Sequence, residues 1–321
     1  MIAVYVRSIS AEDPLSGLGV GERPDPDPPQ GWAVVRVRAA ALNHHDLWAL
    51  RGPGLREDQL PMILGTDAAG VDEDGNEVIV HPVISRDEWR GDETLDPEGT
   101  LLSDLHQGAM AERVMVPRRN LVPKPAGLSF EEAACLPSAW LTAYRMLFVK
   151  ARAQPGQTVL VQGAGGGVAT AAIALGRVTG LRIWVTSRDE SKRARALEQR
   201  ADQAFATGAR LPERVDVVLE TVGEATWGHS LRSLRPGGTL VVAGATSGFD
   251  PPAELARLFF LQLNVLGSKV GTRDELVQLL RLLEDTGVRP VVDRVLPLAE
   301  ARAGFEAMAS GDLFGKIVFT P

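Results

Sequence analysis

The sequence contains a single cysteine, Cys135, among its 321 residues. One cysteine excludes an intrachain disulfide framework, and it excludes a structural zinc site made of four thiolates from this chain. Cys135 lies in the apolar helical stretch 131–136. This setting favours a small buried hydrophobe over a reactive thiol.

Long apolar runs and an excess of positive charge are also missing. No run approaches the roughly 18–20 apolar residues that span a membrane. The formal charge of −7 argues against nucleic acid or an anionic membrane as the main partner. The first residues already alternate like a strand, so we expect no signal peptide and a cytoplasmic protein. The length allows two domains, and the 45% hydrophobic and 23% charged residues are typical of a soluble globular protein.

The first third of the chain is predicted to be rich in β-strands. Ser129 and Glu132 form a capping box that predicts a helix, and Pro137 separates it from a second helix over about 138–149. The long polar segment 84–108 is functional, mobile or the remnant of a lost element. Short strands are predicted at 33–38, 77–80 and 113–116.

From residue 158 onward, strands alternate with helices, which predicts an α/β fold with a doubly wound parallel sheet. The segment 207–214 is too short and too broken for a crossover helix. A helix over 274–284 precedes two extended segments, 291–295 and 316–319, which we expect to return to the β-rich domain. The predicted strands of the parallel sheet are 158–162, 182–186, a short one near 204, 215–219, 239–243 and 265–268.

The turn 163–169 follows an apolar strand and opens a helix. Its glycines let the backbone approach a pyrophosphate, and the free amides of the helix N-terminus face the negative charge. The contacts are made by Gly163 and Gly166 with Ala169, or in a neighbouring register by Gly165 and Gly167. The turn therefore predicts dinucleotide binding.

The end of the second strand favours NADPH over NADH. Rossmann folds that prefer NAD usually carry an acidic residue there, whereas this strand ends in Ser187 and Arg188. Arg188, with Lys192 one turn later, suits the 2′-phosphate of NADPH. Alternatively, 187–190 is only a helix capping box, or Asp189 or Glu190 takes the acidic role.

Over nearly its whole length the chain resembles the medium-chain dehydrogenase/reductase superfamily. The resemblance implies a split GroES-like β-rich domain, residues 1–125 and 268–321, and a Rossmann domain, residues 126–267, with the active site in a cleft. It also implies a homodimer formed through the edge of the Rossmann sheet, where the apolar segment 258–261 is either part of the interface or buried within one monomer. The blocks that carry the resemblance are 41–46, 64–70, 141–144, 163–169, 234–238, 266–268 and 314–318.

Within that superfamily the chain is similar to the zinc-independent, quinone-oxidoreductase-like branch. Asn43 stands where zinc-dependent members have a cysteine, and Thr66 and Asp67 stand where they have a histidine and a glutamate. Ser138 stands at their remaining cysteine ligand, and the segment 84–108 lacks their second, four-cysteine zinc site. We therefore expect no metal.

Without zinc, another group must polarise the substrate oxygen or deliver a proton. The catalytic candidates are Asn43, as a hydrogen-bond donor to a carbonyl, and His44, as a proton donor that competes with His45. In a strand the two histidines would face opposite ways, so that one at most reaches the cleft. The alternatives are a local cap for Asn43 and structural roles for the histidines. Asp46 is expected to cap the helical turn 47–51.

The resemblance extends the cofactor contacts to further strand ends and to the terminal glycine-lysine motif, whose Lys316 is otherwise a solvated surface lysine. The predicted cofactor-binding residues are Thr142, Gly163, Gly165, Gly166, Gly167, Val168, Ser187, Arg188, Lys192, Val222, Gly244, Ala245, Ser268 and Lys316.

These features predict a zinc-free NADPH-dependent oxidoreductase that transfers hydride to a quinone or an α,β-unsaturated carbonyl. Two alternatives stay open. One is a zinc-dependent type of alcohol dehydrogenase or aldehyde reductase, and the other is a non-catalytic NADP(H)-binding redox sensor.

Overall fold

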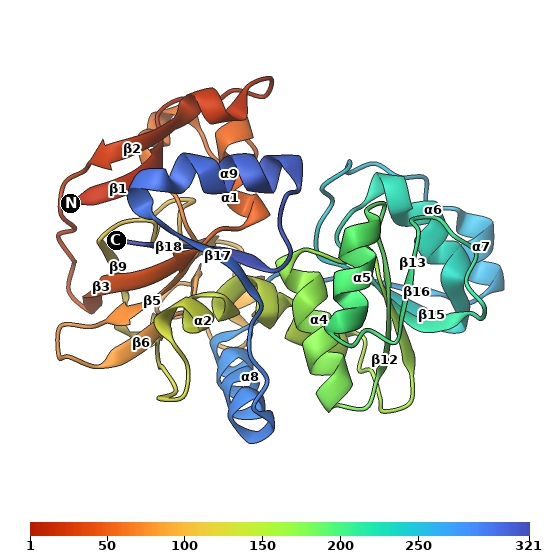
Figure 1. Cartoon of the computed structure of the whole chain (residues 1–321). Helices are drawn as coiled ribbons and strands as arrows, with labels where there is room; N and C mark the ends of the chain where they lie inside the picture. Colours follow the sequence, from red (N-terminus) through yellow and green to blue (C-terminus); the bar gives the residue numbers. More distant parts are fainter. The chain divides into compact units, whose positions relative to one another are not determined.

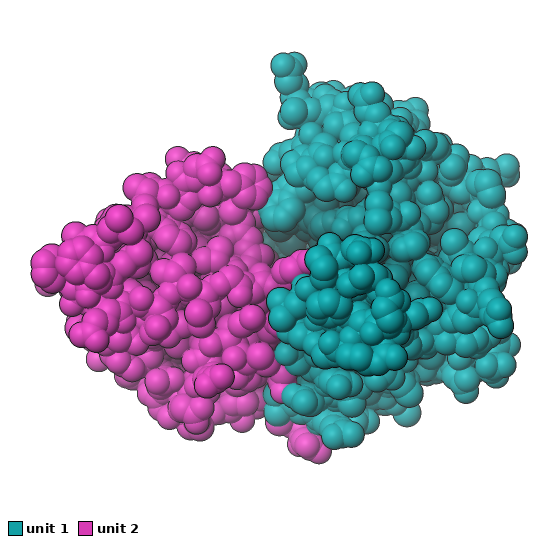
Figure 2. Space-filling model, turned by 180° about the vertical axis from the view of Figure 1, so that it is seen from behind, with its two compact units in different colours: residues 1–139, 272–284, 292–321 teal, residues 140–271, 285–291 magenta.

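The computed structural model describes all residues, 1–321, and they form two compact units, coloured separately in Figure 2. The first comprises residues 1–139, 272–284 and 292–321, and the second comprises residues 140–271 and 285–291. Residues 126–139 thus belong to the β-rich unit, although the sequence placed them with the Rossmann domain, and residues 268–271 and 285–291, which it placed in the GroES-like domain, belong to the second unit. The reason for residues 126–139 is that helix α2 (Phe130–Ala134) packs on strands of the first unit's sheet.

The first unit is built on a seven-stranded sheet with the order β10-β6-β5-β3-β18-β17 and β9 paired to β3 (Figure 1). The C-terminal strands return to this sheet, as predicted, because β18 pairs antiparallel with β3 and places Val318 opposite Ala41. The three strands predicted in the first third are β3, β6 and β9. The bounds are β3 Trp32–Ala41, β5 Asp67–Val71, β6 Glu77–Val80, β9 Arg113–Pro117, β10 Leu121–Pro123, β17 Val292–Pro297 and β18 Lys316–Thr320.

Shorter elements complete this unit. Helix α9 (Ala301–Ser310) buries Phe305, whose ring stacks on that of Phe319 in β18. The capping box of Ser129 and Glu132 is present at the start of α2, as predicted. The remaining elements are β1 (Ile2–Val6), β2 (Leu18–Glu22), β4 (Met62–Ile63), α1 (His44–Arg51) and α8 (Arg273–Thr286).

The polar segment 84–108 is held in place by a pair of short strands and by hydrogen bonds of its own side chains. Strand β7 (Val83–Ile84) pairs with β8 (Thr100–Leu101). Between them, the buried carboxylate of Asp96 accepts hydrogen bonds from the backbone and the guanidinium of Arg86. The segment is therefore an ordered excursion from the sheet.

The second unit is a six-stranded parallel sheet with the order β13-β12-β11-β14-β15-β16. This confirms the doubly wound fold, and the strand order reverses between β11 and β14, which is where such sheets bind ligands. No helix lies between β13 and β14, as the broken segment 207–214 predicted. The strands are β11 (Thr158–Val161), β12 (Arg182–Thr186), β13 (Gln203–Phe205), β14 (Val215–Glu220), β15 (Leu234–Val242) and β16 (Asn264–Gly267), and the helices are α3 (Leu141–Tyr144), α4 (Gly167–Val178), α5 (Glu190–Glu198), α6 (Glu224–Ser233) and α7 (Leu255–Phe260).

The structure bears on two features of the sequence, its single cysteine and its lack of long apolar runs. Cys135 is buried, and burial raises the pKa of its thiol to about 12, so it is the inert hydrophobe that the sequence predicted. None of the helices combines the length and the apolar character needed to cross a bilayer.

Candidate active site

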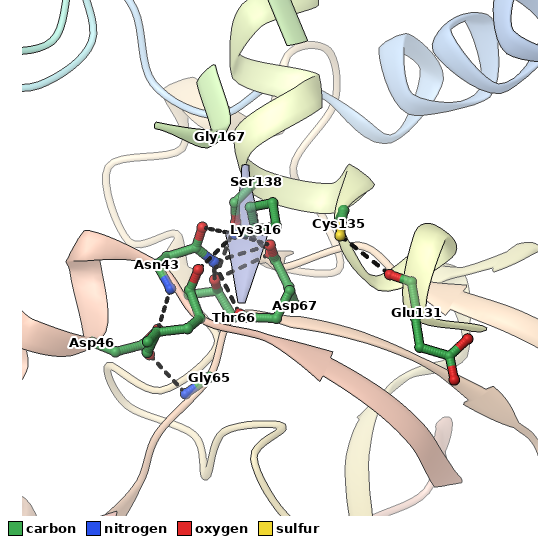
Figure 3. Close-up of polar contacts among 12 residues, drawn as sticks. Asn43, Asp46, Gly65, Thr66, Asp67, Glu131, Cys135, Ser138, Gly167 and Lys316 are labelled. Carbon is green, nitrogen blue, oxygen red and sulfur yellow. Dashed lines mark hydrogen bonds and ion pairs between the residues drawn. The ribbon is translucent and has the colours of Figure 1, made fainter. Parts of the chain in front are cut away.

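Five side chains from separate parts of the first unit meet around one buried carboxylate (Figure 3). We call them the polar cluster: Asn43, Thr66, Asp67, Ser138 and Lys316. Asn43 precedes α1, Thr66 precedes β5, Asp67 is the first residue of β5, and Lys316 is the first residue of β18. Four of the five are the positions where the sequence predicted zinc ligands to be replaced, so the fold brings these positions together.

The carboxylate of Asp67 is the acceptor at the centre of the cluster. Ser138 Oγ donates to Asp67 Oδ1 at 2.5 Å, and Asn43 Nδ2 donates to Asp67 Oδ2 at 2.9 Å. Thr66 Oγ1 donates to Asp67 Oδ1 at 3.2 Å and receives a second hydrogen bond from Asn43 Nδ2 at 3.1 Å. Asp67 is fully buried, and these bonds offset the free-energy cost of removing its carboxylate from water.

Lys316 supplies the positive charge of the cluster. Its Nζ lies 3.7 Å from Asp67 Oδ2 and donates to Asn43 Oδ1 at 2.5 Å and to the carbonyl oxygen of Leu42 at 2.7 Å. Lys316 is only 3% exposed, so its interpretation as a solvated surface lysine is wrong. Its contacts also lie within the first unit, which leaves its predicted cofactor role without support from this geometry.

The chemistry of the polar cluster does not fit zinc. Zinc sites in proteins use thiolate, imidazole and carboxylate ligands. Here one carboxylate is surrounded by an amide, two hydroxyls and an ammonium group, and the ammonium lies against the same carboxylate that would bind the metal. Nowhere in the chain do three or more histidine, cysteine, aspartate or glutamate side chains gather so as to hold a metal ion.

Asn43 has the capping role that was one of its two predicted alternatives, and its role as a donor to a carbonyl stays a prediction. It is the N-cap residue of α1, and its side chain also lies in the polar cluster, where Nδ2 donates to Thr66 and Asp67. A hydrogen bond from Asn43 to a substrate therefore requires exchange of one of these partners. Asp46 takes part in capping α1, but as the third residue of the helix and not as the residue before it: its carboxylate accepts the backbone N–H of Asn43 at 2.8 Å.

The two histidines lie in the first turn of α1, so the strand geometry considered for them is wrong. In a helix, successive side chains point about 100° apart. His45 Nε2 lies 3.0 Å from Asp104 Oδ1. Burial alone would lower the pKa of His45, but the hydrogen bond to Asp104 and nearby carboxylates outweigh it and raise that pKa. The side chain of His44 is exposed, and crowding by protein atoms, followed by the charge of Lys316, lowers its pKa.

In the second unit, the predicted cofactor residues form a line along one edge of the parallel sheet. They follow the carboxyl ends of five adjacent strands, where open α/β sheets bind ligands. Lys192 lies on α5, and Thr142 lies on α3, which packs against α4. In spatial order the strand-end residues are Ser187 and Arg188 after β12, Gly163 to Val168 around the turn after β11, Val222 after β14, Gly244 and Ala245 after β15, and Ser268 after β16.

The glycine turn has room for a ligand. Gly163 has a φ of +92°, which favours glycine, and a Cβ placed on Gly163 or on Gly166 would meet nothing within 4 Å. Gly166 is the N-cap of α4, whose first amides have no partner within the helix. An open backbone turn at a helix N-terminus fits the pyrophosphate of a dinucleotide.

The carboxylate of Asp189 is already engaged beside this turn. It accepts the backbone N–H groups of Ser191 at 2.8 Å and Lys192 at 3.2 Å, which makes Asp189 the N-cap of α5. The predicted capping function is thus present, with Asp189 as the cap, and it competes with the alternative that Asp189 binds a ribose. Arg193, which the sequence analysis did not single out, donates to the carbonyl oxygen of Ser187 at 2.8 Å.

Comparisons with known proteins agree with both units. The family described as zinc-binding dehydrogenase matches residues 158–319, and the alcohol dehydrogenase GroES-like domain matches residues 29–126. The chain belongs to the medium-chain dehydrogenase/reductase superfamily. It is therefore an oxidoreductase with a GroES-like unit and a Rossmann unit, although its polar cluster does not offer the metal ligands that the first description suggests.

Individual relatives point to nicotinamide chemistry on different substrates. The chain is 27% identical to an acryloyl-coenzyme A reductase of Sulfurisphaera tokodaii, over 98% of this chain and 100% of the relative. It is similar to the crystal structure of an NAD-dependent alcohol dehydrogenase, with a TM-score of 0.92, 33% identity and complete coverage of both chains. It is also similar to the 2-octenoyl-CoA carboxylase reductase CinF in complex with NADP and 2-octenoyl-CoA, with a TM-score of 0.90, 25% identity and coverage of 99% and 87%.

The sequence missed the pairing of Lys316 with Asp67. Thr66 and Asp67 were identified only as replaced ligands, and Lys316 was grouped with the cofactor residues. A buried carboxylate is stabilised by a cation or by hydrogen bonds, and no local pattern singles out Lys316 among the 34 lysines and arginines of the chain.

The buried Asp46 makes stability depend on pH. Burial raises the pKa of Asp46 from 3.8 to about 6, so between these values the folded state holds a proton that the unfolded state has released. Its stabilising contribution is therefore complete below pH 3.8 and is lost as the pH rises through 6, by about 2–3 kcal/mol. Urea unfolding at several pH values should show this fall, and the fall should be smaller in Asp46→Asn. An equal fall in both proteins would contradict the assignment, and Glu306→Gln is the exposed control.

Removing the ammonium of Lys316 should destabilise the first unit. Lys316→Met leaves the buried Asp67 carboxylate without its cation, and breaking a buried pair in this way costs about 3–5 kcal/mol of unfolding free energy. The double variant Asp67→Asn/Lys316→Met should recover part of this loss, because no buried charge is left. Urea unfolding tests both variants, with Lys150→Met as the control. Wild-type stability in Lys316→Met would show that the pair does not hold the cluster.

Proposed function

We propose that this protein is a zinc-free, NADPH-dependent reductase of α,β-unsaturated carbonyl compounds. The observation that carries the proposal is the polar cluster, in which hydrogen-bonding side chains stand at the positions of metal ligands and an ammonium lies against their one carboxylate. The named activities of the acryloyl-coenzyme A reductase and of CinF support a conjugated carbonyl as the substrate class. These names favour a conjugated carbonyl over a quinone, because none of the relatives described above is named for a quinone.

A nicotinamide cofactor supplies the hydride in this chemistry, while the protein supplies binding and polarity. The residues that fit it lie along the carboxyl edge of the second unit's sheet. The open turn at Gly163 and Gly166 and the first amides of α4 fit the pyrophosphate. Ser187, Arg188 and Lys192 fit the 2′-phosphate, because Asp189 is engaged as a helix cap.

The substrate oxygen would be polarised from the polar cluster. Asn43 has two amide hydrogens, and Lys316 fixes the opposite end of that amide by donating to Oδ1. Exchanging the bond to Thr66 for one to a carbonyl oxygen would make the β-carbon of the substrate a better hydride acceptor. His44 or solvent would then protonate the α-carbon; the lowered pKa of His44 makes its imidazolium a stronger acid, but it also leaves less of this side chain protonated near neutral pH, which favours solvent.

Two other functions have specific observations behind them. The similarity to an NAD-dependent alcohol dehydrogenase favours alcohol or aldehyde chemistry. The internal pairing of every polar group around Asp67 favours a non-catalytic redox sensor, because no donor is left over for a substrate. The experiments below separate these functions from the reductase.

A homodimer is part of the proposal. Strand β16 is at the edge of the parallel sheet and pairs only with β15. Beside it, Phe259 and Phe260 of α7 are 64% and 76% exposed, and Val265 of β16 is 41% exposed. Large exposed apolar side chains next to an open sheet edge favour association of two copies. Leu258 and Leu261 are half-buried within the monomer, so only part of the predicted segment 258–261 is free for an interface.

The protein should contain no stoichiometric zinc. Elemental analysis after expression in zinc-supplemented medium and dialysis is expected to give well under one zinc per chain, because the cluster offers no thiolate or imidazole ligand. Reductase activity should be unchanged by a strong chelator. One dialysis-resistant zinc per chain would favour the alcohol dehydrogenase.

NADPH should bind more tightly than NADH and should reduce conjugated carbonyls. Cofactor fluorescence gives both dissociation constants, and NADPH oxidation is followed over a panel of enones, unsaturated thioesters, quinones and aldehydes. Arg188→Ala should weaken NADPH binding about tenfold through loss of charge-assisted hydrogen bonds, with little effect on NADH. Arg195→Ala, on helix α5, which follows Arg188, is the control.

Turnover restricted to alcohols and aldehydes would contradict the reductase and support the dehydrogenase. NADPH binding without turnover of any compound in the panel would support the redox sensor.

A further inference from the structure

A second network of polar side chains lies beneath the carboxyl edge of the parallel sheet, entirely within the second unit. Gln162 follows β11, Thr186 ends β12, Glu220 ends β14, and His229 and Ser230 lie on α6. We call these five residues the edge network. All of them are buried, and neither the zinc comparison nor the proposed chemistry assigns them a role.

The orientation of Gln162 is fixed by its neighbours. Thr186 Oγ1 donates to Gln162 Oε1 at 2.7 Å and accepts the backbone N–H of Gly163 at 3.3 Å. Because Oε1 is the acceptor here, Nε2 is the end of the amide that faces α6. It lies 3.0 Å from Ser230 Oγ and 2.9 Å from His229 Nδ1, so each of its two hydrogens has one partner.

These bonds determine the tautomer of His229. Its Nδ1 receives a hydrogen from Gln162 and therefore carries none, while Nε2 lies 2.9 Å from the carbonyl oxygen of Ala209, which only accepts. The ring is thus neutral with its hydrogen on Nε2. A hydrogen on Nδ1 would place two donors face to face in a buried site, which is unfavourable.

The network continues to the loop after β14. Ser230 accepts from Gln162 and donates to Glu220 Oε2 at 2.6 Å. Glu220 Oε1 in turn accepts the backbone N–H groups of Val222 at 2.8 Å and Gly223 at 3.0 Å. One continuous set of hydrogen bonds therefore joins the first glycine of the turn after β11 to the loop after β14.

We propose that His229 is a positioning residue for dinucleotide binding. In its neutral Nε2–H form it fixes the orientation of the Gln162 amide. Gln162 then positions the backbone of Gly163 through Thr186. It positions the backbone of Val222 through Ser230 and Glu220. The two loops flank the point where the strand order reverses, which is where these sheets bind ligands. The cofactor half of this inference rests on the proposed function, whereas the tautomer does not.

Nitrogen-15 NMR of the histidine-labelled full-length protein tests the tautomer. The chain has five histidines, and the signals lost in His229→Asn identify His229. The expected result at neutral pH is a neutral ring with the hydrogen on Nε2. A hydrogen on Nδ1, or a doubly protonated ring, would overturn the inference whatever the protein binds.

Two substitutions test the positioning role. In His229→Asn the side-chain oxygen replaces the acceptor Nδ1, so the NADPH dissociation constant should stay within about threefold of wild type. In His229→Gln the longer amide keeps the donor towards Ala209 but loses that acceptor, so binding should weaken about tenfold. His106→Asn, in the first unit, is the control.

Thermal unfolding without cofactor is measured beside these affinities. Both variants remove one buried hydrogen bond, so a merely structural role predicts similar losses of stability and equal changes in NADPH affinity. Equal weakening in both variants, or no weakening in His229→Gln, would overturn the positioning role. If wild type binds neither NADPH nor NADH, the proposed function and the cofactor half of the inference fail together, and the NMR result still decides the tautomer.

Discussion

The ion pair between Lys316 and Asp67 is the interaction on which the first unit's candidate site depends. Both side chains are buried, and each would be costly in that position without the other. Lys316 also fixes the amide of Asn43, and Asn43 begins α1. The pair therefore holds the side chain of Asn43 at the N-terminus of α1.

The same pair gives the polar cluster a positive charge that the protein itself supplies. In a zinc site the cation organises ligands that would otherwise repel one another or remain unpaired. Here an ammonium carried by β18 lies against the only carboxylate of the cluster, and two hydroxyls and an amide complete its hydrogen bonds. The positive charge is part of the protein itself, so its position is fixed when β18 joins the sheet.

Local patterns in the sequence were enough to predict most of the second unit. Alternation, the glycine turn and the broken segment 207–214 identified the parallel sheet and its missing helix, because each of these signals lies within a few neighbouring residues. Local patterns predicted the cofactor residues of the glycine turn and of the end of β12, whereas the other predicted cofactor residues came from the family resemblance. The edge network was not predicted, because Gln162 and His229 meet only after the sheet and α6 have packed together.

The first unit was harder to predict from the sequence, because its important contacts also join residues that are far apart along the chain. A capping role of Asp46 was recognised, but α1 begins at His44, three residues before the predicted turn, so the histidines were treated as if in a strand. Residues 126–139 were placed in the wrong unit because the packing of α2 on β3 and β5 leaves no local mark. Lys316 pairs with Asp67 across most of the chain, a distance over which periodicity carries no information.

That separation along the chain has a consequence for the order in which the protein is made. Asp67 leaves the ribosome early, the residues of the second unit follow, and Lys316 comes only after them. The second unit consists mostly of one continuous stretch, so its sheet can form while synthesis continues. Asp67 meanwhile has no internal cation, and the nascent first unit must leave it in water. The polar cluster can therefore close only after Lys316 has been synthesised, when the residues of the second unit have already left the ribosome.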